Sequence, residues 1–141
     1  MITFLKAEEQ HQHSNGGGWV ANTAVVAASA YIGPDAWVYG DAWVYGHAQV
    51  CGHALVYGDA RVFGNALVSG KAQVYGDAWV YGTALVYDNA RVFGNAQVYG
   101  NARVFGDARV YGDARVCDHA RVYGQYAGAP YSGPVAAQEK I

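Results

Sequence analysis

The sequence predicts an all-β solenoid, in which short strands wind into a stack of coils. A unit of six residues repeats without losing register from Val20 to Val122, as in GDAWVY, GDARVF and GNAQVY. An aliphatic residue fills every sixth position, and from Val26 onward an alanine lies two places before it. Glycine with aspartate or asparagine separates most units, and this pair is typical of turns.

A single unit shows how the side chains divide between the inside and the outside. In an extended strand, Ala108 and Val110 point to one side and Arg109 and Tyr111 to the other. Arg109 cannot lie inside because a lone buried charge is very costly, so the alanine and valine face inward. Glycine and the following aspartate form the corner, where Asp and Asn tolerate left-handed backbone angles. A helix is excluded, since six is not a multiple of 3.6 and valine disfavours helices.

Because one strand of this length cannot bury a core by itself, the coils must stack on one another. Their parallel strands then lie about 4.8 Å apart. The pattern aliphatic-x-x-Asn/Asp-small-x, seen in VFGNAQ and VYGNAR, resembles the hexapeptide repeat of left-handed parallel β-helices. That resemblance implies left-handed winding, three flat faces and about 18 residues per coil, hence about six triangular coils here. One departure is that an aromatic residue follows the aliphatic one and glycine comes next.

A second resemblance concerns the start of the repeat. The lead NGGGWV, followed by units of the VYGDA type, is similar to the YdcK-type β-solenoid repeat. Proteins with that repeat are bacterial or phage proteins and are often labelled putative transferases. The resemblance therefore implies a bacterial or phage protein with the same solenoid fold.

The non-repetitive ends divide the chain into three parts. Residues 1–18 are expected to form an N-terminal cap, in which ITFLKAEEQ makes a short strand or helical turn over the first coil. The glycines at 16–18 allow a sharp turn into the repeat. Residues 19–124 form the solenoid, and residues 125–141, with two prolines, form an irregular C-terminal tail.

Composition and charge limit which partners and which cellular location are expected. The formal net charge is -2, so neither nucleic acid nor a membrane is expected as a partner. No apolar run approaches the roughly 20 residues of a membrane span. The N-terminus contains Glu8 and Glu9 and lacks the apolar segment of a secretion signal. We therefore expect a cytoplasmic protein or, by resemblance, a phage-associated one.

Outward side chains should stack in three ladders if positions about 18 residues apart coincide, and each ladder runs from apolar residues to arginine. The first ladder contains Trp19, Trp37, Leu55, Gln73, Arg91 and Arg109. The second contains Val25, Trp43, Arg61, Trp79, Gln97 and Arg115. The third contains Tyr31, Gln49, Leu67, Leu85, Arg103 and Arg121.

The residues that follow the aliphatic positions should form three further columns. The first column is Tyr39, Tyr57, Tyr75, Phe93 and Tyr111; the second is Tyr45, Phe63, Tyr81, Tyr99 and Cys117; the third is Cys51, Ser69, Tyr87, Phe105 and Tyr123. Stacked rings would stabilise the solenoid by about 0.5–1.5 kcal/mol per pair. Cys51 and Cys117 fall on different corners several coils apart, beyond the roughly 7 Å reach of a disulfide, so we expect none.

We interpret the protein as a non-enzymatic structural or protein-interaction module that self-associates, as a homotrimer or end to end. The uniform repeat has no inserted loop, where chemistry is usually carried. Large aromatic side chains on an outer surface mark interfaces. The predicted interface residues are Trp19, Trp37, Trp43, Tyr39 and Tyr57.

The arginines that end the ladders have two interpretations. The first is a solvated face, on which Asp107, Asp113 and Asp118 form local ion pairs with them. The second is an anionic partner, such as a phosphate, a nucleic acid or an acidic protein surface, held by guanidinium groups. The predicted anion-binding residues are Arg91, Arg103, Arg109 and Arg121.

The main alternative function, which the hexapeptide resemblance implies, is an acyltransferase with its active site between subunits. His47, His53 and His119 are the candidates, although they occupy corner positions that mostly hold Asp or Asn. A γ-type carbonic anhydrase needs three converging histidines, whereas His47 and His119 should lie roughly 19 Å apart. Glycan binding on the aromatic columns stays open. We assign no catalytic residue, metal ligand or cofactor.

Overall fold

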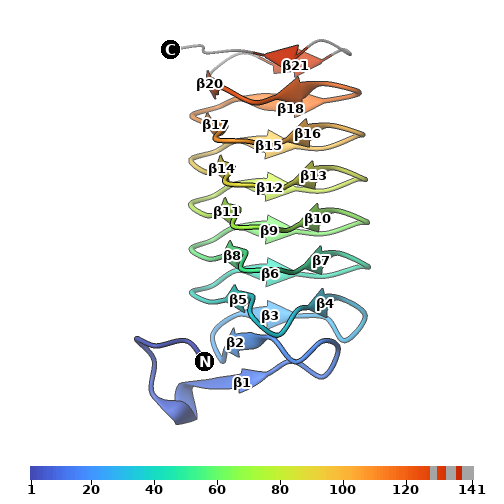
Figure 1. The fold of residues 1–141 in the computed structure, drawn as a ribbon. Coiled ribbons are helices and arrows are strands. Elements are labelled where there is room, and N and C mark those ends of the chain that lie inside the picture. The colour runs from blue at the N-terminus through green and yellow to red at the C-terminus, as the bar shows by residue number, and fades with distance from the viewer. Residues whose placement is uncertain (128–129, 133–135, 138–141) are drawn as a thin grey trace.

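A computed structural model describes residues 1–127, 130–132 and 136–137 of the chain. The strands stack as a three-sided column, with β1 at one end and β20 and β21 at the other (Figure 1). Each coil gives one strand to each of three sheets, and every strand pairing after β1 is parallel. This confirms the predicted all-β parallel solenoid of about six coils; its left-handed winding stays a prediction.

Three sheets form the three faces. Sheet A contains β1 (Gln10–Gln12), β2 (Trp19–Ala21), β5 (Trp37–Val38), β8 (Leu55–Val56), β11 (Gln73–Val74), β14 (Arg91–Val92), β17 (Arg109–Tyr111) and β20 (Gln125–Ala127). Sheet B contains β3 (Val25–Val26), β6 (Trp43–Val44), β9 (Arg61–Val62), β12 (Trp79–Val80), β15 (Gln97–Val98), β18 (Arg115–Cys117) and β21 (Pro130–Ser132). Sheet C contains β4 (Tyr31–Ile32), β7 (Gln49–Val50), β10 (Leu67–Val68), β13 (Leu85–Val86), β16 (Arg103–Val104), β19 (Arg121–Val122) and β22 (Ala136–Ala137).

The coils hydrogen-bond to one another at the corners as well as along the strands. Leu55 of β8 pairs with Gln73 of β11, one coil further on. At the next corner, the Tyr57 N–H donates to the Val74 carbonyl at 3.0 Å and the Asp59 N–H donates to the Gly76 carbonyl at 2.9 Å. The outer side chains therefore project from a backbone that is hydrogen-bonded from coil to coil.

The interior has the composition that the repeat predicts. Each repeat alanine and aliphatic residue from Ala30 to Val122 is fully buried. The core of the first coil is less completely buried, because Val26 is only partly buried. Stacked valines and alanines therefore fill a narrow core, and the variable residues lie outside it.

At the corners, the left-handed backbone falls on glycine rather than on the aspartate or asparagine after it. Gly64 has a φ of 69°, and a Cβ there would lie 3.0 Å from the Gly82 nitrogen of the next coil. Only glycine fits such a position without strain. Among the described residues, two aspartates take the glycine position: Asp88 has a φ of 59° and Asp118 a φ of 58°.

The N-terminal end is covered by the chain itself. The 3-10 helix η1 (Ala7–Glu9) leads into β1, which pairs antiparallel with β2. The buried Gln10 side chain accepts from the Ile2 N–H at 2.8 Å and donates to the Ile2 carbonyl at 3.1 Å. The buried His13 ring places Nε2 2.8 Å from the Ala30 carbonyl oxygen. These contacts hold the N-terminal segment against the first coil.

The C-terminal segment extends the sheets in its described part. The sequence predicts an irregular tail from residue 125, yet β20, β21 and β22 pair in parallel with β17, β18 and β19. Their residues are offset by fewer than 18 positions; Gln125, for example, pairs with Arg109. The other residues of the predicted tail, 128–129, 133–135 and 138–141, lie outside the described part.

Candidate functional site

The outward residues stack in the three predicted ladders. In sheet A, Trp19 pairs with Trp37 and, at the far end, Arg91 pairs with Arg109. In sheet C, Arg103 pairs with Arg121 in the same way. Each face therefore changes from aromatic or aliphatic side chains near the N-terminus to arginines near the C-terminus.

The aromatic columns form as predicted and lie beside the ladders. In the first column, the rings of Tyr39 and Tyr57 are 4.7 Å apart at an interplanar angle of 2°, and the stack continues through Tyr75 and Phe93 to Tyr111. The second column stacks from Tyr45 through Phe63 and Tyr81 to Tyr99. The third stacks Tyr87 on Phe105, and Tyr123 is tilted by 40° to that ring.

Several tyrosines in these columns have a pKa above the ordinary value for tyrosine. Burial, with the neighbouring Tyr57 as a second cause, raises the pKa of Tyr39 to about 12. Burial also raises the pKa of Tyr57 and of Tyr81, and a hydrogen bond with Cys117 raises that of Tyr99. Stacked phenols disfavour ionisation because it would place a charge against a partly buried ring.

Four of the five predicted interface residues share sheet A and its flanking column: Trp19, Trp37, Tyr39 and Tyr57. The chain's own N-terminal segment packs on this region. The Phe4 ring meets the Tyr39 ring edge-on, with centroids 4.9 Å apart, and the Trp37 ring at 6.2 Å. This aromatic face is therefore partly covered within a single chain.

Trp43, the fifth predicted interface residue, lies on sheet B and is 43% exposed. It forms one side of a stack that the sequence analysis did not single out. The Arg61 guanidinium carbon is 4.9 Å from the centroid of the Trp43 ring and 5.4 Å from that of Trp79. The signal was present in the second ladder, where Arg61 falls between the two tryptophans. We call Trp43, Arg61 and Trp79 the sheet B stack.

Flat cations between two indole rings gain cation–π stabilisation on both faces. Such a stack also fixes the orientation of the guanidinium, whose in-plane N–H groups remain available for a carboxylate or phosphate. Arg61 is partly buried, whereas the arginines that end the ladders are exposed. Among the described residues, Arg61 is therefore an arginine that is both partly buried and held against two aromatic rings.

The local ion pairs expected for the terminal arginines do not form within the described residues. No lysine or arginine nitrogen there lies within 4.0 Å of a carboxylate oxygen. Asp107, Asp113 and Asp118 therefore leave the stacked pairs unneutralised at short range. The pairs Arg91–Arg109 and Arg103–Arg121 consequently bring like charges together in neighbouring strands.

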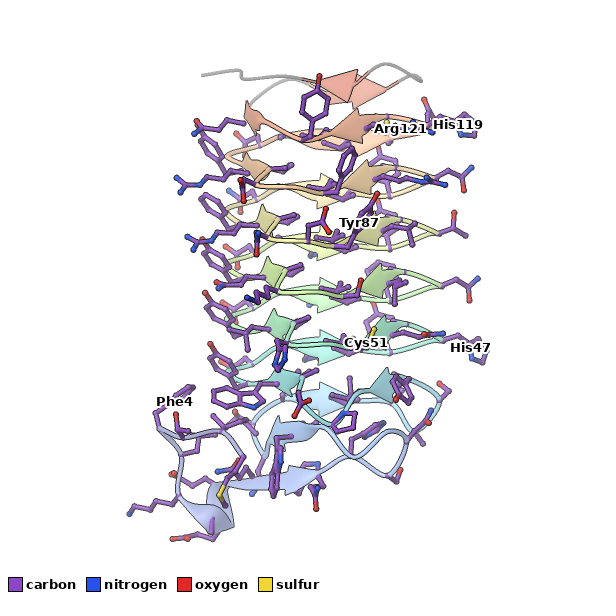
Figure 2. All side chains as sticks on the ribbon, in the orientation of Figure 1. Phe4, His47, Cys51, Tyr87, His119 and Arg121 are labelled. Atoms are coloured by element: carbon purple, nitrogen blue, oxygen red, sulfur yellow. The ribbon has the colours of Figure 1, made fainter. Side chains whose placement is uncertain are left out.

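The three candidate histidines lie on three different surface grooves. His119 lines a groove with Arg103 and Arg121 on sheet C, and His47 lines another on the same face. Figure 2 shows both at the same corner of the column, His119 beside Arg121 at the C-terminal end and His47 nearer the N-terminus. His53 lines a third groove next to Trp37 on sheet A. One chain does not bring these histidines together.

Cys51 and Cys117 are not joined by a disulfide. Burial raises the pKa of the Cys51 thiol, and Cys117 lies at the end of the second column, next to Tyr99. Within the described residues, no three His, Cys, Asp or Glu side chains come close enough to hold a metal ion. The same part of the chain contains no helix with the length and apolar character that crossing a membrane requires.

Comparison with known proteins identifies the class of repeat. A family model described as the YdcK beta solenoid repeat matches residues 48–62, 84–97 and 96–112. The resemblance to this repeat is thereby confirmed, and the matched segments all belong to the stacked coils. No curated protein and no solved structure matches the chain.

Proposed function

We propose that this protein is a structural or interaction β-solenoid, which associates side by side with its own copies and presents its arginine ladders to an anionic partner. The observation that carries self-association is the exposed apolar end of the sheet B ladder, next to the sheet B stack. Trp43 and its ladder neighbour Val25 are exposed by 43% and 51%. Exposed apolar side chains beside an ordered arginine are typical of interface centres.

The contrast with sheet A supports the choice of face. Phe4 packs on Trp37 and Tyr39, so part of the aromatic surface of sheet A is already in contact with protein. Trp43 has the ring of Tyr45 edge-on beside it and Arg61 over one face. It nevertheless remains among the most exposed large hydrophobic residues described. Burial of Trp43 by a second copy would remove this apolar area from water.

Sheet B also carries charges suited to pairing with a copy of itself. Asp59 lies at the corner two residues before Arg61 and is exposed. A two-fold interface repeats every contact, so Arg61 of one copy can meet Asp59 of the other, and the reverse. The bidentate fork of a guanidinium held between two rings suits a carboxylate partner.

The N-terminal end supports lateral association over end-to-end stacking. β1 runs antiparallel across β2, and η1 folds beside it, so sheet A does not present β2 as an open parallel edge, whereas β3 and β4 are the N-terminal edge strands of sheets B and C. A covered edge blocks strand addition at that point. End-to-end addition on sheet A is therefore disfavoured, which supports association through the faces.

The proposal is tested by the solution mass of the wild type and of Trp43→Glu, measured by light scattering. Gln49→Glu is the matched control, because Gln49 is an exposed outward residue of the same coil on sheet C. We expect the wild type and the control to have a multiple of the 15.0 kDa chain mass and Trp43→Glu to have the mass of one chain. A monomeric wild type, or a Trp43→Glu variant that stays associated, contradicts the proposal.

A further inference from the structure

The groove at the C-terminal end of sheet C is built from two columns of side chains over three consecutive coils. Its volume is about 320 Å³. Three residues come from the corner column and three from the neighbouring ladder: Thr83, Asn101 and His119, and Leu85, Arg103 and Arg121. The groove therefore follows the axis of the solenoid, and Leu85 lies at its N-terminal end.

The charge of this groove is positive and uncompensated at short range. Arg103 and Arg121 are partners in β16 and β19, and both are exposed. Neither has a carboxylate within 4.0 Å among the described residues. Two guanidinium groups on neighbouring strands repel each other, and an anion between them removes that repulsion.

The uncharged polar residues add hydrogen-bond donors to the same groove. The Thr83 hydroxyl is directed at the Asn101 side-chain oxygen and at the Gly100 carbonyl, 2.9 Å away. This contact places the Asn101 side-chain amide beside Thr83, and the amide contributes NH₂ donors to the groove. Arginine has N–H donors and no acceptor. The groups left for a ligand are thus mainly donors, and they require a ligand rich in acceptors.

We infer that this groove binds a phosphate-type oxyanion. Arg103 and Arg121 hold its oxygens through charge-assisted hydrogen bonds, while Asn101 and His119 add N–H donors from the facing column. The inference rests on the proposed role of the arginine ladders and names the chemical class of their ligand. The groove at the other end of this face offers an internal contrast. Its lining contains no arginine: Asn15, Ser29, Tyr31, His47 and Gln49.

The test is calorimetric titration with inorganic phosphate, pyrophosphate and sulfate at low ionic strength. The double variant Arg103→Gln/Arg121→Gln removes the charges of the groove. Lys6→Gln/Lys71→Gln is the matched control: it removes two exposed positive charges that belong to none of the arginine ladders, and neither residue lines any of the three grooves. Both variants keep the same net charge as each other.

We expect the groove variant to weaken phosphate binding by about tenfold or more and the control by less than about twofold. Tighter binding of pyrophosphate than of phosphate identifies a linked phosphate group as the ligand, whereas equal binding of all three anions identifies a single oxyanion. Equal weakening in both variants, or a wild type that binds none of these anions, overturns the inference. Light scattering on the same samples separates this failure from that of self-association, because the mass depends on sheet B and not on the groove.

Discussion

The N-terminal and C-terminal coils of this solenoid share one interior and differ on the outside. Val56 and Val92 are both fully buried in sheet A, two coils apart, but the residues before them are Leu55 and Arg91. The backbone ladder is the same in both regions. The repeat therefore specifies the scaffold, and the surface chemistry is free to change along it.

The largest expected effect tests whether the interior is equivalent in the two regions. Val56→Ala and Val92→Ala each remove two methyl groups from a fully buried site. We expect each to lower the free energy of unfolding by about 2 kcal/mol, from lost burial and the cavity left behind. Urea denaturation measures both. A difference of more than about 1 kcal/mol between them would show that the two regions are not packed alike.

A second experiment compares the two ends of the outer ladder on sheet B. Trp43→Ala removes the most exposed ring of the sheet B stack, and Arg115→Ala removes the exposed arginine at the other end of the same ladder. We expect Trp43→Ala to raise the dissociation constant of the assembly by about tenfold or more and Arg115→Ala to change it little. Sedimentation at several protein concentrations gives both constants. Equal increases in the dissociation constant would contradict the proposed difference between the two ends of the ladder.

These two experiments rest on features that the sequence predicts to different degrees. The alternation of Ala108, Arg109, Val110 and Tyr111 predicted the inner and outer sides, because a charged residue cannot be buried alone. The six-residue period and the family resemblance together placed the ladders in register. Repetition makes such predictions strong, since any error in one unit would recur in all the others.

What the sequence did not predict concerns side chains that interact across the coils. The sequence correctly predicted that Trp43, Arg61 and Trp79 stack in one ladder. The insertion of the guanidinium between the two rings could not be predicted, because it depends on side-chain rotamers. The packing of Phe4 on Tyr39 depends on the path of a non-repetitive segment, for which no period exists. The ion pairs that one interpretation gave to Asp107, Asp113 and Asp118 are not found among the described residues, and they too depend on side-chain rotamers.

High pH provides a third test, which acts on the N-terminal part of the first aromatic column. The pKa of Tyr39 is raised to about 12 in the folded chain, chiefly by burial, against an ordinary value of about 10. Between these values the unfolded chain has lost a proton that the folded chain still holds, so stability falls as pH rises from about 10 to about 12.

We expect urea denaturation of the wild type to show this loss of stability and the Tyr39→Phe variant to show less of it. Absorbance of the tyrosinate ion should appear at higher pH in the folded wild type than in the chain in urea. Coincident titration of the folded and unfolded forms would contradict the raised pKa of Tyr39.

The smallest expected effect concerns the two corners where aspartate takes the left-handed backbone. The Asp88 carboxylate accepts from the Gly106 N–H at 3.1 Å, whereas no side-chain hydrogen bond of this kind is described for Asp118. Asp118→Gly should raise the free energy of unfolding by about 1 kcal/mol through relief of backbone strain. Asp88→Gly should raise it less, because the hydrogen bond is lost. Thermal denaturation measures the order, and a larger gain at Asp88 would contradict it.

Copies of this protein are proposed to associate through the outer face of sheet B. Small-angle X-ray scattering tests this most directly, because side-by-side association widens the particle and end-to-end association lengthens it. We expect the cross-sectional radius to increase with protein concentration, the length to stay that of one solenoid, and Trp43→Glu to abolish the increase. Growth in length at constant cross-section, or a particle of single-chain size at every concentration, would contradict it.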